Sequence, residues 1–310
     1  MTKNNPIMTK RYDLLDAYRL FASIGVITIH CRYQLVQFQW FQVIQFLLAM
    51  CVPFFFMISG YFLTNKINKI QKQLHKLLGI YLYTLVLYIF IDYIRYGINY
   101  FNFFSLKDIL YILFMNQTPW NGVLWFIPAS IMLLICDKYI FSKISNIHSR
   151  IIFIVSLTLS LTLITYKYKG GIDISITNFY IQGIPFYLLG RQLSLLETES
   201  LRRIAIFSSV TAICIIIFSL IKDSFYDNRF IIGTIALTII FISGLLYKKD
   251  NTIISIIGVL GRKYSLGIYI YHIISIWLTP GILKRVGHEE IFQNMPVISG
   301  GCKLNCVSKE

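Results

Sequence analysis

Three side chains that could do chemistry lie in one apolar stretch near the start of the chain. Asp16, Arg19 and His30 fall within residues 14–30, whose other side chains are mostly apolar. A histidine can accept a proton near neutral pH, whereas an arginine stays charged and can bind phosphates or carbonyl oxygens. Charged groups inside a membrane-spanning segment are costly, so each of them is a candidate for a functional role.

The spacing of Arg19 and His30 places both side chains on one face of a helix. The two residues are eleven positions apart, which is about 20° more than three full turns and ~16 Å along the axis. Asp16 and Ser23 fall near the same stripe, so this helix would present a polar track across most of a bilayer. A simpler interpretation stays open, in which Asp16 and Arg19 anchor the helix at one interface and His30 begins the next loop.

A second polar face lies near the other end of the chain. Ser265 and His272 are seven residues apart in the apolar segment 264–279, so their side chains nearly align on a helix. In the simpler interpretation His272 is a buried, neutral histidine bonded to a neighbouring helix. In the other it pairs with a substrate or with another span.

Two further patches combine aromatic, small and proline residues. Pro53 can kink the segment that contains it, and the small pair Ser59 and Gly60 permits close helix contact, so a structural role is favoured there. Trp120 and Trp125 are expected at the outer membrane interface, where tryptophans commonly form a belt. They could also line the mouth of a cavity.

The elements that must position these residues are apolar segments long enough to cross a membrane. Hydrophobic residues make up 56% of the 310 residues and charged residues 14%, against about 25% charged residues in soluble domains. The segments are continuously apolar rather than alternating, which favours helices over a barrel. We therefore predict an all-α, polytopic integral membrane bundle. Its nine predicted spans are 14–30, 40–63, 77–94, 122–140, 151–166, 174–190, 204–221, 230–247 and 264–279, and short separate pieces at 106–115 and 253–260 precede the fourth and ninth.

Basic residues concentrate in every second loop, which predicts the orientation of the chain. Cytoplasmic loops carry an excess of lysine and arginine. This pattern predicts a cytoplasmic N-terminal segment at 1–13, a transmembrane domain at 14–279, an external polar tail at 280–310 and a plasma-membrane location. The residues assigned to the cytoplasmic side are Lys3, Lys10, Arg11, Lys66, Lys69, Lys72, Lys76, Lys138, Lys143, Arg150, Arg191, Arg202, Arg203, Lys248, Lys249, Arg262 and Lys263.

Several function classes are disfavoured by the charge distribution and by missing motifs. The net charge of +15 would suggest nucleic acid in a soluble protein, but here the basic residues flank apolar segments and fit lipid headgroups. No phosphate-binding G-x-x-x-x-G-K-[ST], G-x-S-x-G or H-E-x-x-H motif occurs. Cys302 and Cys306 form only a weak metal-ligand pattern, and no metal is expected.

Five patches in a fixed order resemble the acyltransferase family 3 membrane proteins. The Arg-x10-His spacing of Arg19 and His30 is similar to that family's catalytic signature. The other four patches are VPFFFMISGY at 52–61, LWFIPA at 124–129, IPFYLLG at 184–190 and YSLGIYIYH at 264–272. The resemblance runs from residue 12 to about residue 279.

The resemblance implies an O-acyltransferase that modifies sugars of the cell envelope or of exported polysaccharides. It implies acyl-coenzyme A, here expected to be acetyl-CoA, as the donor, and a cell-surface glycan or lipid-linked sugar as the acceptor. His30 would then act as general base, Arg19 would bind the coenzyme or the thioester oxygen, and Asp16 would orient Arg19. Family members usually have a tenth span, so the polar 280–310 tail indicates either a truncated or frameshifted chain or a last helix that is dispensable. Second-tier site candidates are Ser59, Trp125, Ser265 and His272.

Two alternatives accompany this prediction. A relative of this fold forms the membrane half of bacterial membrane-bound serine racemases and is associated with serine uptake. The polar track would then be a permeation or binding path without acyl chemistry. The third possibility is an inactive, degenerate member of the family.

Overall fold

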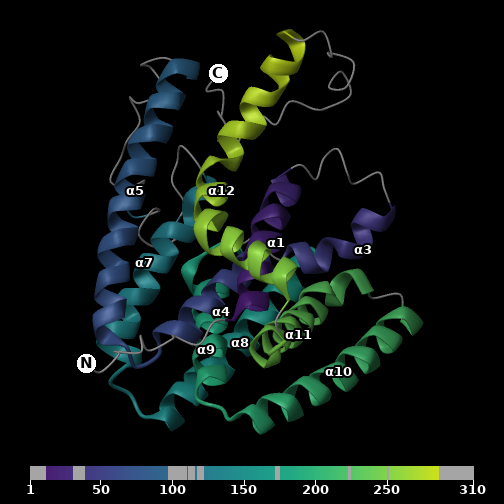
Figure 1. Ribbon diagram of the computed structural model, residues 1–310. Helices are drawn as coiled ribbons and strands as arrows, with labels where there is room; N and C mark the ends of the chain where they lie inside the picture. Colours follow the sequence, from purple (N-terminus) through teal and green to yellow (C-terminus); the bar gives the residue numbers. More distant parts are fainter. Residues whose placement is uncertain are drawn as a thin grey trace, which may run out of the picture.

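The computed structural model describes residues 12–30, 39–96, 110, 116, 122–171, 175–222, 225–249 and 251–285. Every regular element in these ranges is helical, which confirms the all-α class. Helices suit lipid because they satisfy each backbone N–H and C=O within the segment. In chain order the elements are α1 (Asp13–His30), α3 (Gln39–Leu48), α4 (Cys51–Leu63), α5 (Ile67–Tyr96), η2 (Gly122–Trp125), α7 (Phe126–Cys136), η3 (Asp137–Phe141), α8 (Asn146–Tyr168), η4 (Phe179–Gly183), α9 (Ile184–Ser194), α10 (Thr198–Ile221), α11 (Phe225–Leu246) and α12 (Thr252–Arg285) (Figure 1).

Six helical segments among the described residues are long and apolar enough to cross a membrane. They are Ile44–Leu63, Ile67–Ile91, Asn146–Lys167, Thr198–Ile221, Asp227–Leu246 and Thr252–Ile276, and they correspond to the second, third, fifth, seventh, eighth and ninth predicted spans. The first predicted span is α1, whose 18 residues include Asp13, Asp16 and Arg19. The fourth and sixth are assembled from shorter helices.

The helix α10 shows the kind of surface that this protein presents to lipid. Phe207 and Ile221 are 74% and 75% exposed, and only Leu201 and Ser219 of this helix are buried. Figure 1 shows α10 at one edge of the bundle, with α11 between it and α1. A large, continuously apolar exposed face fits a membrane far better than water.

The helices α1 and α12 form the central contact of the bundle. A Cβ atom on Gly261 would collide with the carbonyl oxygen of Asp16, and one on Gly258 would lie 2.7 Å from that of Asp13. The absence of a side chain at these two glycines lets the backbones approach closely. Gly258 approaches Asp13 and Gly261 approaches Asp16, so residue numbers rise in the same direction along both helices. α1 and α12 therefore run parallel, as expected for the first and ninth predicted spans.

A second glycine-mediated crossing joins α4 to α9. A Cβ atom on Gly60 would collide with the carbonyl oxygen of Tyr187, and one on Gly190 would collide with that of Met57. This reciprocal arrangement confirms the predicted close helix contact at Gly60. It also brings residues of the second and sixth predicted spans into one core.

The second predicted span is interrupted by a short turn, and the boundaries of the ninth are wrong. The span 40–63 is divided between α3 and α4, and Pro53 lies in the first turn of α4, where its missing N–H costs little. The pieces predicted at 253–260 and 264–279 are one helix, α12, which also continues past residue 279 to Arg285. Packing against α1 supports this helix through Gly261. The piece predicted at 106–115 lies outside the described residues except for Leu110.

Candidate functional site

A cluster of ion pairs occupies the start of α1. Asp16 Oδ1 lies 3.0 Å from Arg19 Nη1, and Asp16 Oδ2 lies 2.5 Å from Arg262 Nη1 on α12. Arg262 Nη1 is also 3.3 Å from Asp13 Oδ1. One nearly buried carboxylate therefore holds two guanidinium groups, and Asp16 makes the contact that an orienting residue for Arg19 requires.

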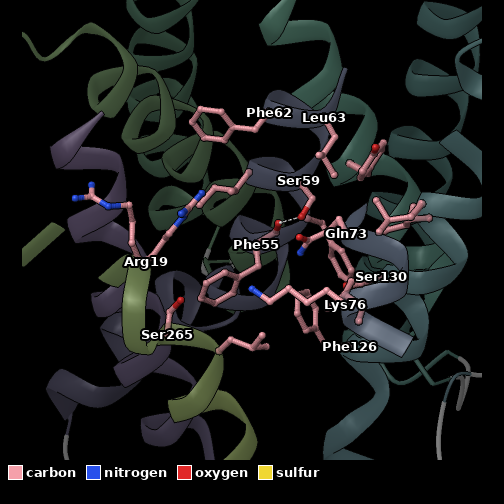
Figure 2. A pocket seen from close by; sticks show the side chains of 18 residues that line it. Arg19, Phe55, Ser59, Phe62, Leu63, Gln73, Lys76, Phe126, Ser130 and Ser265 are labelled. Carbon is pink, nitrogen blue, oxygen red and sulfur yellow. Dashed lines mark hydrogen bonds between the residues drawn. The ribbon is translucent and has the colours of Figure 1, made fainter. Parts of the chain in front are cut away.

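Beside this cluster lies a cavity of about 340 Å³, called here the Arg19 cavity. Arg19, Lys76 and Arg262 line it, and none of its described lining residues is acidic. Figure 2 shows Lys76 reaching across the cavity toward the side that carries Ser265. Aromatic side chains, among them Phe55, and a few hydroxyl and amide groups form the remaining walls. Cations without facing carboxylates, set among aromatic rings, suit a ligand that has both anionic and apolar parts.

A second cavity of about 280 Å³ surrounds the other end of α1 and is called here the His30 cavity. Its polar lining consists of one imidazole, two amides, a hydroxyl, an indole and one guanidinium. Amides both donate and accept hydrogen bonds, and an indole offers a flat apolar face, so this lining suits a neutral, hydroxyl-rich ligand. The residues that contribute these groups are His30, Gln45, Gln182, Thr177, Trp125 and Arg229.

His30 has a second histidine as its neighbour. The ring centroids of His30 and His272 are 5.0 Å apart, so α12 places its buried histidine against the end of α1. His272 Nδ1 lies 2.6 Å from the carbonyl oxygen of Tyr269. His272 thus contacts both its own helix and another span. Among the described residues, no group of three or more His, Cys, Asp or Glu side chains could hold a metal ion.

The predicted polar track along α1 is interrupted in the structure. The Arg19 and His30 cavities share no lining residue. Phe56 and Phe126 line the Arg19 cavity and Trp125 lines the His30 cavity, and the Phe56 ring packs 5.9 Å from Trp125 and 4.9 Å from Phe126 between centroids. We call these three residues the aromatic wall. α1 therefore serves two separate cavities rather than one continuous path.

The second-tier candidates do not share one site, and His272 lines neither of the two cavities but a third one beside α12. Ser59 and Ser265 line the Arg19 cavity, so Ser265 does not share a site with His272 despite the predicted common face. Trp125 is 6% exposed and lines the His30 cavity, which supports the cavity interpretation rather than the lipid-facing belt. Trp120 lies outside the described residues.

Several lining residues were missed because they looked like topology signals or ordinary apolar sequence. Lys76 and Arg262 were assigned to cytoplasmic loops, but they belong to α5 and α12 and line the Arg19 cavity. Gln182 stands alone in an apolar run, and Gln45 is the last of several glutamines that recur between residues 34 and 45. An amide in such a run is costly in lipid unless it finds a partner, and this was the available signal for the His30 cavity.

A buried ion pair was also missed. Arg191 Nη1 lies 2.8 Å from Asp137 Oδ1, and the two side chains are 3% and 0% exposed. The Tyr187 hydroxyl donates to Asp137 Oδ2 at 2.8 Å, and Arg191 Nη2 donates to the carbonyl oxygen of Phe141 at 2.8 Å. The assignment of Arg191 to a loop is wrong, because this residue lies inside α9. Since Tyr187 lines the Arg19 cavity, the pair holds part of that cavity's wall.

Comparison with known proteins places the chain in a family. A family model described as an acyltransferase domain matches residues 12–302. An amino-acid racemase of Enterococcus faecalis is 32% identical over 139 residues, which cover 40% of this chain and 19% of the racemase. The chain thus spans about a fifth of the length of that relative. No solved structure matches the chain. Because the family model covers nearly every residue, including all of both cavities, the chain belongs to the membrane acyltransferase family that its five patches resemble, acyltransferase family 3.

Proposed function

We propose that this protein transfers an acyl group, expected to be acetyl, from acetyl-CoA to a hydroxyl of a cell-surface glycan or lipid-linked sugar. The observation that carries the proposal is the pair of unlike cavities at the two ends of α1. One is lined by three cations and the other, apart from Arg229, by uncharged hydrogen-bonding groups. An acyl transfer needs two such sites, because the donor is a polyanion and the acceptor is a polyol.

The Arg19 cavity is the proposed donor site. Coenzyme A carries several phosphate oxygens, which Arg19, Lys76 and Arg262 can bind without an opposing carboxylate in the cavity. Asp16 holds both arginines from outside the cavity lining. The Arg19 guanidinium carbon also lies 5.7 Å from the centre of the Phe62 ring, which restrains its position further.

The His30 cavity is the proposed acceptor site. A sugar hydroxyl is a poor nucleophile at neutral pH, so its proton must be removed as the oxygen attacks. His30 takes this proton while the hydroxyl oxygen forms a bond to the thioester carbonyl carbon. The carbon–sulfur bond then breaks, and His30 returns the proton to the departing thiolate. The products are the sugar ester and free coenzyme A.

The aromatic wall lies between these sites, so the acyl end of the donor must pass it to reach His30. In the proposed arrangement the phosphates stay in the Arg19 cavity and only the slender thioester arm crosses. The predicted orientation, with the N-terminus in the cytoplasm of a plasma-membrane protein, would then supply the donor from inside and the acceptor from outside.

The test compares surface glycans from cells that lack the gene, cells complemented with the wild type, and cells complemented with His30→Ala. Mass spectrometry should show an acyl increment only with the wild type, while immunoblots show equal amounts of both proteins in the membrane. His148→Ala is the matched control, because His148 lies on α8 and its Nδ1 contacts the Ser145 hydroxyl at 2.7 Å. Unchanged acylation in the deletion strain, or full complementation by His30→Ala, would overturn the proposal.

The match to an amino-acid racemase supports a second candidate, an amino-acid uptake module. The two cavities would then be binding sites on a transport path, and the aromatic wall would be its barrier. Proteoliposomes that take up labelled serine, together with no thiol release from acetyl-CoA in the presence of glycan acceptors, would favour this function over acyl transfer.

A further inference from the structure

We propose that His272 is a positioning residue that fixes the tautomer and ring orientation of His30. This inference rests on the proposed function only for its kinetic consequence. The structural part concerns two imidazole rings, one at the end of α1 and the other inside α12, whose centroids are 5.0 Å apart. It can be tested without turnover.

The protonation of His272 follows from its own hydrogen bond. Its Nδ1 lies 2.6 Å from the carbonyl oxygen of Tyr269, and a carbonyl oxygen can only accept. Nδ1 must therefore carry a proton. A neutral imidazole has one N–H, so Nε2 of His272 presents a bare lone pair.

That lone pair has no partner among the described residues. His272 is 3% exposed, and its Nε2 is buried without a hydrogen bond. A buried acceptor is costly to leave unsatisfied, and nearly all such atoms in folded proteins find a donor. The Tyr269 ring packs 5.8 Å away, but its hydroxyl makes no hydrogen bond to Nε2. The remaining ring beside His272 is His30.

Donation from His30 to His272 Nε2 would satisfy this acceptor and would also define His30. One nitrogen of His30 then carries the proton that points at His272, and its other nitrogen is left unprotonated as the base in the cavity. Hydrogen bonds between catalytic groups are often long in substrate-free structures and tighten when substrate binds. The present ring separation is compatible with such a starting state.

The proposed hydrogen bond would parallel the way an aspartate orients the histidine of a serine hydrolase, but with a neutral partner. When His30 takes the hydroxyl proton, it becomes a cation with two N–H groups, and His272 keeps accepting one of them. An uncharged acceptor suits this apolar setting, because a buried carboxylate would need compensating charges of its own.

Nitrogen NMR on the full chain, labelled at its histidine rings and held in lipid nanodiscs, tests the tautomer directly. The His30 signals are identified by their loss in His30→Gln. In the wild type His30 should show a single neutral tautomer. In His272→Phe it should show a mixture, whereas His272→Gln should restore one form because the amide oxygen still accepts. His272→Met serves as a second apolar variant should His272→Phe not fold.

Kinetics provide the second readout. His272→Phe should lower kcat by about 100-fold, the lower end of what a general base contributes, without changing the KM for the donor. His272→Gln should stay within about tenfold of the wild type, and His148→Phe should have no effect. An unchanged His30 tautomer in both apolar variants, or equal damage by Gln and Phe, would overturn the inference. A wild-type protein that transfers no acyl group would instead overturn the proposed function, and the NMR measurement would still decide the contact between the two histidines.

Discussion

The two ends of the α1–α12 pair differ in the kind of interaction they offer. At the Asp16 end, three cations line a cavity while the neighbouring carboxylates hold two of those cations from outside it. At the His30 end, two imidazoles stand together beside a cavity with amides and an indole. The same two helices, in contact along one seam, therefore support one charged site and one largely neutral site.

This difference indicates how a membrane protein can separate binding from proton transfer. Binding a polyanion needs permanent positive charge, whereas a general base must be uncharged before the reaction. A dense cluster of guanidinium groups beside the base would disfavour its cationic form. A separation of ~16 Å along α1 and an aromatic wall keep the two requirements apart.

The largest expected effect comes from removing His30, the proposed general base. His30→Gln keeps a hydrogen-bonding side chain but cannot take a proton at neutral pH, so the transfer rate should fall about 10²- to 10⁴-fold. Binding of the donor should be unchanged, because the Arg19 cavity does not include His30. Thiol release and donor titration on purified protein measure the two quantities, and a loss of donor binding would show that the ends are not separate.

The next largest effect should come from the Arg19 cavity, the proposed donor site. Lys76→Gln removes one of its three cations and should weaken donor binding by about 1–2 kcal/mol, or roughly 5- to 30-fold. The KM for the acceptor should stay the same. Lys72→Gln is the matched control, because Lys72 lies on the same helix but does not line the cavity. Equal effects of both substitutions would indicate that the overall positive charge of α5, rather than Lys76 in the cavity, affects donor binding.

A smaller effect is expected at the His30 cavity, the proposed acceptor site. Gln182→Leu removes a neutral hydrogen-bonding group, worth about 0.5–1.5 kcal/mol, so the KM for the acceptor should rise a few-fold. The KM for the donor should not move. Gln71→Leu, at an exposed position on α5, controls for the loss of an amide elsewhere. A change confined to the donor KM would reverse the assignment of the two cavities.

The smallest effect is a difference in salt dependence. Raising the ionic strength from about 0.01 M to 0.1 M shortens the screening length from about 30 Å to about 10 Å. The donor KM should rise several-fold over this range, and the acceptor KM should change by less than about twofold. Lys76→Gln should flatten the donor response. Parallel curves for both substrates would show that charge does not distinguish the two ends.

The parts of this arrangement that belong to a single helix could be predicted from sequence. Arg19 and His30 do share α1, and Gly60 does mark a close crossing. The spacing of residues on one helix does not show which side chains of other helices pack beside it. The separation of the two cavities by Phe56 and Phe126 therefore could not be predicted from the polar face of α1. These rings come from α4 and α7, and their positions depend on tertiary packing.

Contacts between residues that are distant in the sequence also could not be predicted from the sequence. Asp137 and Arg191 each lie near the end of an apolar run, where a charged residue usually belongs to a loop and an arginine helps to set orientation. Their contact depends on how α9 packs against the short helix η3. Pattern alone does not distinguish a buried ion pair from two topology signals, because both place a charge at the edge of a hydrophobic segment.

The aromatic wall also has an electrical consequence. A catalyst that admits a charged substrate from one side of a membrane and a polar one from the other risks becoming an ion leak. Phe56, Trp125 and Phe126 are at most 9% exposed, and they bring the wall of the Arg19 cavity, formed in part by Phe56 and Phe126, against that of the His30 cavity, formed in part by Trp125. A hydrophobic constriction of this kind excludes water and thereby blocks ions. The three rings would thus let a narrow acyl chain through while preserving the voltage across the membrane, which acts on each elementary charge with about 2.3 kcal/mol per 100 mV.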